Sequence, residues 1–149
     1  ALVRVLGLGV CGVPWAGAAL AAEGRVSEEL LARWWQLAAW LPTGPEGGSD
    51  AARAAWRAAL AERTRLTPYL DTHRELAASD GTPVARPVWW SSPGDRVSRE
   101  CEDVFVVGDA FLVAPVLEPG CGERRLRLPH GWWYDVTTGA AHLGPGRVV

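Results

Sequence analysis

The sequence predicts a protein of α and β structure in which helices occupy the first part of the chain and strands the second, with the change near residue 80. Between residues 28 and 41 the apolar side chains recur every three or four positions, as in an amphipathic helix. From Thr82 onward the period becomes two, which indicates strands. The apolar run Gly108–Gly120 has turn formers at both ends and no helical spacing. We expect it to be a buried strand around which the other strands pack.

The first segment, Val5–Ala22, is 18 residues long without a charge, which is the length of a membrane span. Its four glycines and Pro14 argue against a span. We expect instead a buried parallel strand over Leu6–Val13, followed by a glycine-rich loop.

Two helices are predicted next. Ser27 with two following glutamates is a helix start, and this first helix should end before Pro42. After a loop rich in glycine and proline, Asp50 is expected to cap a second helix, which should kink or break at Pro68 and end near Gly81.

The remaining chain predicts short strands that are separated by turns. Pro115, inside the central run, cannot donate a hydrogen bond to a neighbouring strand, so a bulge, bend or edge is expected there. Pro129, His130 and Gly131 predict a turn. The other strands are expected at residues 84–90, 104–107, 126–128 and 132–136.

Composition places the chain among globular proteins. It has 149 residues, of which 48% are hydrophobic, and a net charge of −2. The basic residues are dispersed, so neither nucleic acid nor an anionic membrane surface is an expected partner. The three cysteines are widely spaced, and we expect no disulfide framework, no metal site and no cofactor. Because the chain contains no methionine, we expect it to be an internal fragment of a longer protein.

The acidic residues suggest structural roles. Glu100, Glu102 and Asp103 form the densest acidic cluster, and we interpret it as a solvated turn rather than an acid/base site. Arg86 is expected to form an ion pair with Asp103 or with Asp109.

The histidines also suggest no catalytic site. His73 is expected to be a surface or partly buried residue, because no nucleophile stands at a recognisable spacing from it. His130 and His142 lie in predicted turns without metal-binding partners.

Six segments of the chain, in the same order, resemble glycoside hydrolase family 31, the α-glucosidase-like enzymes. They are CGVPWAG (11–17), EELLARWWQLAAWLP (28–42), RLTPYLDTHRELAASDGTPV (65–84), TPVARPVWW (82–90), EDVFVVGDAFLVAPVLEPG (102–120) and LPHGWWYDVTTG (128–139). The segment RPVWWSSPGD (86–95) is most similar to an animal, membrane-anchored branch of that family.

The resemblance implies a fold class of α/β plus all-β. Residues 1–81 would be the last part of a (β/α)8 TIM barrel, and residues 82–149 the start of a C-terminal β-sandwich domain. Enzymes of this family cleave α-glycosides with retention, using two carboxylates. In the family both carboxylates lie upstream of the matching segment, so no catalytic residue is expected here and the chain alone should be inactive.

The resemblance also singles out substrate-binding candidates, which are Trp15, Ala19 and Trp40. Ala19 stands where the family usually has an aspartate. Trp15 and Trp40 are candidate sugar contacts near the expected mouth of the barrel. Residues 43–50 contain neither arginine nor histidine, whereas the family usually has R-x-H-N there, with the histidine holding a sugar hydroxyl.

Three functions follow as alternatives. The parent protein would hydrolyse the O-glycosyl bonds of α-glycosides, or it would be a non-catalytic, membrane-anchored relative that acts as a binding or interaction protein. A stand-alone carbohydrate-binding module would instead need an exposed aromatic strip. We expect no such strip, and we expect four strand tryptophans to contact the core or the barrel: Trp89, Trp90, Trp132 and Trp133.

The resemblance implies partners and a compartment as well. The expected partner is an α-glycoside substrate, and a membrane would be contacted only through a segment outside this chain. The implied location is the secretory pathway or a membrane-anchored position facing the lumen or the exterior. An isolated fragment of this kind should expose apolar helix surface and aggregate.

Overall fold

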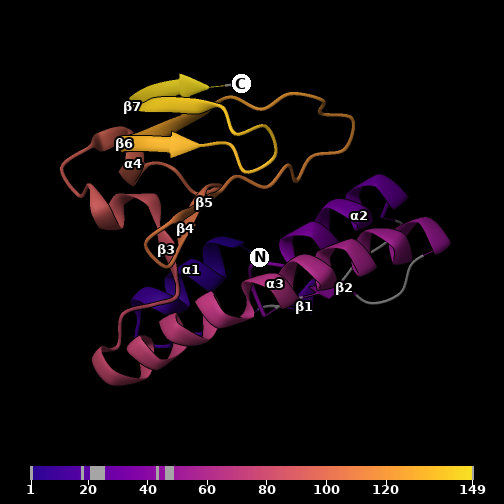
Figure 1. Ribbon diagram of the computed structural model, residues 1–149, viewed down its shortest axis with the longest axis horizontal. Coiled ribbons are helices and arrows are strands. Elements are labelled where there is room, and N and C mark those ends of the chain that lie inside the picture. Colours follow the sequence, from indigo (N-terminus) through magenta and orange to yellow (C-terminus); the bar gives the residue numbers. More distant parts are fainter. Residues whose placement is uncertain (1, 18, 21–25, 43, 46–48, 149) are drawn as a thin grey trace.

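The computed structural model describes residues 2–17, 19–20, 26–42, 44–45 and 49–148. Helices α1 (Leu2–Val10), α2 (Glu28–Leu37) and α3 (Asp50–Asp80) lie on one side of a three-stranded sheet. That sheet is formed by β3 (Ala85–Pro87), β4 (Phe105–Val107) and β5 (Phe111–Val113). The hairpin of β6 (Leu126–Tyr134) and β7 (Ala141–Val148) lies on the other side of the sheet (Figure 1). Apart from a pair of two-residue strands within the helical half, the long helices come first and the strands afterwards, as predicted.

Helix α1 corrects the prediction of a strand over Leu6–Val13. Its buried residues are Leu2, Val5, Leu6 and Gly9, and this spacing of three and four places them on one helical face. A Cβ added at Gly9 would lie 3.1 Å from the Pro83 side chain, so the missing side chain lets the helix approach the segment before β3. Because apolar residues also occupy the outer face of α1, the sequence does not display the helical period. Within the described part of the chain, no helix is long and apolar enough to cross a membrane.

A short parallel strand pair lies in segments that the sequence predicts to be loops. Strand β1 (Ala19–Leu20) pairs in parallel with β2 (Gly44–Pro45), and Ala19 is opposite Gly44. A Cβ added at Gly17 would overlap the backbone carbonyl of Pro42. The two connections that lead into β1 and β2 can therefore lie side by side only because residue 17 is a glycine.

Helix α2 is confirmed. The Ser27 hydroxyl accepts a hydrogen bond from the Leu30 amide at 3.3 Å and caps the helix, as the sequence predicts. At its other end, Arg63 of α3 donates hydrogen bonds to the carbonyls of Ala38, Ala39 and Leu41 at 3.0–3.4 Å. This guanidinium binds the carbonyls of the C-cap residue of α2 and of the turn that follows it.

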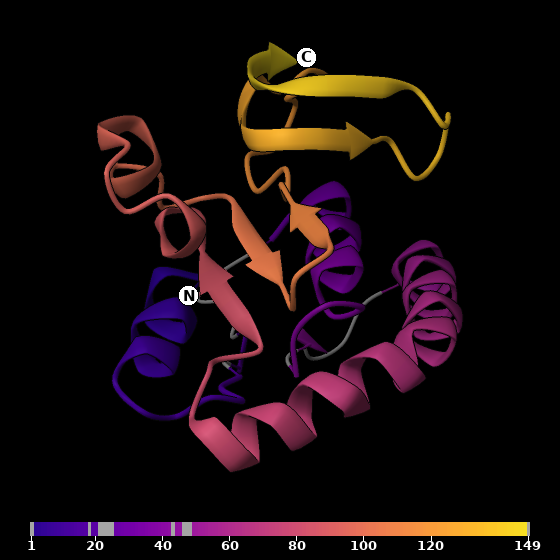
Figure 2. The same ribbon diagram turned by 60° about the vertical axis from the view of Figure 1, so that its left-hand side comes forward.

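Helix α3 is 31 residues long and includes Pro68. Its N-cap is Ser49, whose hydroxyl accepts from the Ala52 amide at 3.4 Å, and not Asp50 as predicted. The helix does not break at Pro68. It changes direction along its length instead, as Figure 2 shows. Gly81, with φ of 78°, ends it in the left-handed conformation expected of a helix C-terminus.

The antiparallel sheet has the order β3-β4-β5, and its most deeply buried strand is β4. Phe105 and Val107 of β4 are fully buried, whereas Phe111 and Leu112 of β5 are half-buried. The predicted central strand is therefore shorter than the run Gly108–Gly120, and Pro115 lies beyond its end. The strand predicted at residues 84–90 also shortens, because the 3-10 helix η1 (Val88–Ser91) follows β3 directly.

Strand β6 corrects a second boundary. The sequence predicts two strands separated by a turn at Pro129, His130 and Gly131, but β6 continues through them with an irregularity between Leu128 and Gly131. Gly131 has φ of 116°, a conformation that permits a bulge without ending the pairing. The predicted turn near Thr138 and Gly139 does connect β6 to β7.

One hydrophobic core joins the helices to the three-stranded sheet. Its buried members come from both halves of the chain: Leu2, Val5, Leu6, Ala16, Leu37, Leu41, Leu66, Leu70, Ala77, Val84, Ala85, Phe105, Val107 and Val113. Contacts across this core give the sheet its position on the helices.

A polar contact between α2 and the loop after β5 reinforces that position. Glu29 and Arg33 form an ion pair of 2.5 Å on α2. The Glu29 carboxylate accepts the Gly120 amide at 3.0 Å, and Arg33 donates to the carbonyls of Glu118 and of Cys121, the latter at 2.7 Å. We call this set of bonds the α2 clasp.

Candidate functional site

The two tryptophans predicted as sugar contacts are both engaged by other side chains. Trp15 precedes β1, and its ring lies 5.8 Å from the Arg63 guanidinium and 5.5 Å from that of Arg74. Both arginines come from α3, and these distances allow cation–π attraction. Trp40 follows α2, and its ring centroid lies 5.1 Å from that of Phe111 in β5. Both rings also pack against the hydrophobic core.

Ala19, the third predicted residue, lies in β1, but its side chain falls outside the described part of the structure, as do residues 21–25 and 46–48 that follow β1 and β2. Its role in substrate binding stays a prediction, as do those of Trp15 and Trp40.

The acidic cluster is a solvated surface, as interpreted from the sequence. Glu100 is exposed and pairs with Arg96 at 3.1 Å, and Asp103 is exposed and pairs with Arg124 at 2.6 Å. Surface pairs of this kind contribute little to stability. Among the described residues, no group of three or more potential ligands could hold a metal ion.

The predicted ion pair of Arg86 forms with Asp109. The guanidinium of Arg86 lies 2.7 Å from the Asp109 carboxylate, and the Arg86 side chain is only 13% exposed. Arg86 also donates to the Pro83 carbonyl at 2.8 Å. The pair fixes the turn between β4 and β5 against β3.

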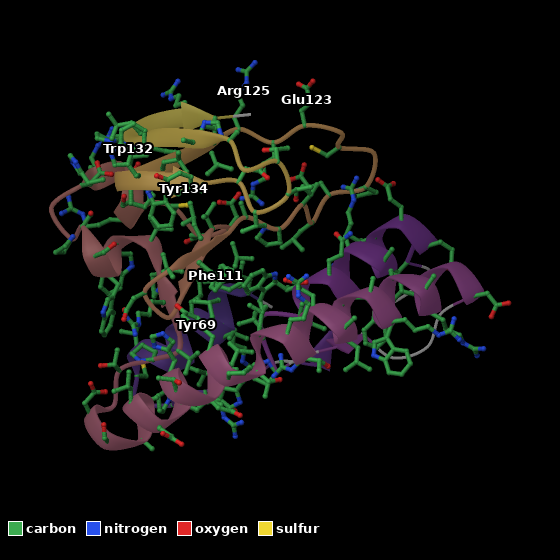
Figure 3. The ribbon with its side chains drawn as sticks, viewed as in Figure 1. Tyr69, Phe111, Glu123, Arg125, Trp132 and Tyr134 are labelled. Atoms are coloured by element: carbon green, nitrogen blue, oxygen red, sulfur yellow. The ribbon has the colours of Figure 1, made fainter. Side chains whose placement is uncertain are left out.

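Tyr69 of α3 holds the same turn from the other side. Its hydroxyl donates to the Val107 carbonyl at 3.0 Å and accepts the amides of Asp109 at 2.9 Å and of Ala110 at 3.0 Å. Its ring lies edge-on to Phe111, with centroids 5.0 Å apart, and Figure 3 shows the two rings between helix and sheet. No local sequence pattern indicates this role of Tyr69, because its partners lie 38 to 41 residues away.

His73 is buried, which corrects the prediction of a surface or partly buried residue. It is 6% exposed, and its ring packs edge-on to Tyr69 with centroids 4.5 Å apart. Within the described part of the chain, its Nδ1 atom has no hydrogen-bond partner. Gly108 touches both rings, since a Cβ added there would overlap Tyr69 Oη and His73 Nε2. Its φ of 56° is a second reason for glycine at this position.

A concavity lies between β5 and the hairpin of β6 and β7. It has a volume of about 870 Å³, and its lining includes Leu112, His130, Trp132, Tyr134 and His142. Trp132 is 63% exposed and Tyr134 is 66% exposed.

The expectation that the four strand tryptophans contact the core is therefore wrong for two of them. Trp132 is largely exposed and Trp90 is 39% exposed, whereas Trp89 and Trp133 are half-buried. The signal was present in the sequence. Trp132 and Tyr134 alternate with Trp133, so on a strand with one wet face at least one of these three aromatic residues must face solvent.

The described residues thus supply a concavity whose lining includes aromatic, apolar and polar side chains. Comparison with known proteins shows where such a segment occurs. Residues 81–148 match the family model "Glycosyl hydrolase family 31 C-terminal domain".

Curated relatives extend the match to the helical half. The chain is 36% identical over 145 residues to a probable alpha-glucosidase from Oryza sativa subsp. japonica, covering 89% of this chain and 16% of that protein. It is 34% identical over 111 residues to the myogenesis-regulating glycosidase of Mus musculus, covering 70% of this chain and 16% of that protein. The chain therefore spans about a sixth of the length of these relatives.

Solved structures agree. A family 31 alpha-xylosidase from a soil metagenome, complexed with xylose, superposes with a TM-score of 0.78 at 28% identity, over 97% of this chain and 27% of that one. A cycloalternan-forming enzyme from Listeria monocytogenes gives a TM-score of 0.86 at 24% identity, over 97% of this chain and 16% of that one. With the sequence motifs, the family model and the solved structures in agreement, the chain belongs to glycoside hydrolase family 31.

Proposed function

We propose that the chain is a C-terminal segment of a parent glycosidase that hydrolyses the O-glycosyl bonds of α-glycosides with retention of configuration. The observation that carries the proposal is the superposition of 97% of the chain on a family 31 alpha-xylosidase at a TM-score of 0.78. The identity of 36% with a probable alpha-glucosidase supports the same substrate class. Carbohydrate metabolism is then the parent's role.

In this proposal residues 1–81 are the last part of a (β/α)8 barrel, and residues 82–149 begin a β-sandwich. The order α1, β1, α2, β2, α3 and the parallel pairing of β1 with β2 support the barrel assignment. Active sites of such barrels lie at the C-terminal ends of the strands. The chain's contribution to the pocket would thus come from the residues that follow β1 and β2, and the two catalytic carboxylates would come from elsewhere in the parent.

The non-catalytic, membrane-anchored alternative has one specific observation in its favour. Ala19 replaces the aspartate usual in the family, and residues 43–50 lack the usual arginine and histidine. A site that recognises sugar hydroxyls by hydrogen bonds loses selectivity when such groups are removed. The similarity to the myogenesis-regulating glycosidase is compatible with either function.

The deciding experiment is an assay of the full-length parent with p-nitrophenyl α-glucoside and p-nitrophenyl α-xyloside. We expect nitrophenol release from at least one of them, and proton NMR should show the α-anomer as the first sugar product. Absence of hydrolysis of both substrates by a folded parent would contradict the proposal and favour the binding protein. Since relatives include lysosomal alpha-glucosidases, we propose a secretory-pathway or lumenal location, which localisation of the tagged parent would check.

A further inference from the structure

One side chain of α3, Arg63, contacts both of the connections that lead into the parallel strands β1 and β2. In the connection from α2 to β2, its Nη1 atom donates hydrogen bonds to the carbonyls of Ala38 at 3.1 Å and Leu41 at 3.0 Å. In the connection from α1 to β1, its guanidinium carbon lies 5.8 Å from the centroid of the Trp15 ring. A single cationic group therefore joins two segments that are distant in the sequence.

The two connections also touch each other. A Cβ added at Gly17 would overlap the carbonyl of Pro42. Each strand begins two residues beyond this contact, β1 at Ala19 and β2 at Gly44, and these two residues are register partners. The contact between residues 17 and 42 thus has the same register as the strand pair. Leu41, which Arg63 binds, is only 1% exposed, so its backbone has little freedom to shift.

The guanidinium of Arg63 is held between partners within the described part of the chain. Burial lowers the pKa of Arg63, and the neighbouring Arg74 lowers it further, whereas Asp71 raises it. Arginine nevertheless stays protonated in proteins, so this charge depends on the groups that it contacts. Its planar shape also donates hydrogen bonds in fixed directions, which an ammonium group does not. Arg63 therefore fixes the direction of the Leu41 carbonyl as well as its distance.

We propose that Arg63 is a positioning residue that sets where β1 and β2 end on the substrate side of the parent's barrel. The inference rests on the proposed function, because it takes the C-terminal ends of these strands to face the substrate. Arg63 contacts residues that precede each strand, so it acts through the strands and does not touch the sugar itself. In this proposal Trp15 also acts through Arg63, and not as a sugar contact.

The test is steady-state hydrolysis of p-nitrophenyl α-glucoside and α-xyloside by the full-length parent. Arg63→Ala should raise KM roughly tenfold and change kcat by less than about threefold, because the catalytic carboxylates come from elsewhere in the parent. Arg63→Lys should recover part of the loss, since it keeps a cation near Trp15 but lacks the planar fork. The matched control is Arg57→Ala, which removes an exposed arginine of the same helix and should leave KM unchanged.

A double-mutant cycle tests the contact itself. Trp15→Leu should raise KM in the same direction as Arg63→Ala, and the double variant should add little, because both changes remove one shared contact. Circular dichroism identifies the variants that are folded at the assay temperature. Arg63→Lys and Trp15→Leu keep the test decisive if Arg63→Ala does not fold. Folded variants with lower thermal stability but unchanged KM, or KM effects that multiply independently, would overturn the proposal.

Hydrogen exchange separates this inference from the proposed function. In Arg63→Ala the peptides that contain β1 and β2 should exchange at least about fivefold faster than in the unaltered parent, and in Arg57→Ala they should not. If the parent hydrolyses neither substrate, the proposed function fails, and unchanged exchange in both strands would overturn the positioning role as well. An active parent whose KM is the same in every variant would overturn the inference and leave the proposed function intact.

Discussion

Replacement of Tyr69 by phenylalanine removes one hydroxyl and thereby three hydrogen bonds between α3 and the turn after β4. Val107 is fully buried, so its carbonyl would lose its partner where water has little access, at a cost of about 1–3 kcal/mol. The amides of Asp109 and Ala110 belong to exposed residues and can bind water instead, so each should cost only about 0.5 kcal/mol. The expected loss is therefore about 2–4 kcal/mol of local stability.

Native-state hydrogen exchange of the full-length parent measures this loss where it occurs. A change of about 2 kcal/mol should make the amides of residues 105–113 exchange about 30-fold faster in Tyr69→Phe. The control is Tyr134→Phe, the chain's other tyrosine, whose side chain is largely exposed, and it should change exchange there by less than about twofold. If Tyr69→Phe raises exchange by less than about threefold, the hydroxyl does not hold this turn and the reasoning fails.

Three further substitutions test other contacts. Gly108→Ala should lower the free energy of unfolding, measured by thermal denaturation, by about 3 kcal/mol or more, because the added methyl group would overlap Tyr69 and His73 at a φ of 56°. The control Gly122→Ala should be tolerated, because a Cβ there would meet no described atom within 4 Å. Arg63→Ala should lower the free energy of unfolding in urea by about 1.5–3 kcal/mol, because its hydrogen bonds to the carbonyls after α2 are lost. An equal loss of stability in Arg57→Ala, which changes an exposed arginine of the same helix, would contradict that explanation. The pKa of Asp135 is lowered in the folded state by the Thr138 and Thr137 amides, so its contribution to hairpin stability is present above the unfolded-state pKa, about 3.9, and is lost as pH falls through the folded value. Asp135→Asn should abolish that part of the acid-induced rise in hydrogen exchange of residues 132–141, and an unchanged pH profile would exclude the carboxylate as its source.

Local sequence signals predicted the elements whose determinants are local. Ser27 caps α2 as expected, because an N-cap hydroxyl and its amide partner are three residues apart. Gly81 ends α3 for a similarly local reason. At Pro68 the helix continues, because packing on both sides outweighs the loss of one backbone hydrogen bond: Leu66 and Leu70 are both in the core.

The helical structure of α1 and the exposure of the hairpin face depend on which residues pack against them. A single sequence does not show these contacts. The apolar run at the N-terminus is compatible with a buried strand or a helix, and only its packing against Pro83 and its neighbours distinguishes the two. The position of Trp132 in a strand predicts contact with the core, whereas β6 leaves its side chain largely in solvent. The Tyr69 contacts join residues about 40 positions apart, so no local pattern indicates them.

The α2 clasp has a consequence for the order in which the molecule can assemble during synthesis. Glu29 and Arg33 reach partners 85 to 91 residues later in the chain. At ribosomal rates of about 5–20 residues per second, roughly 5–20 s separate the emergence of the two sides. In the later part of that interval, once α3 has emerged, α2 has its partners on α3 but not those on the loop after β5. A ribosome that stalls within this window would leave the apolar side of α2 accessible to chaperones. Synonymous changes in the codons for residues 33–121 would therefore alter the yield of folded protein through translation speed alone.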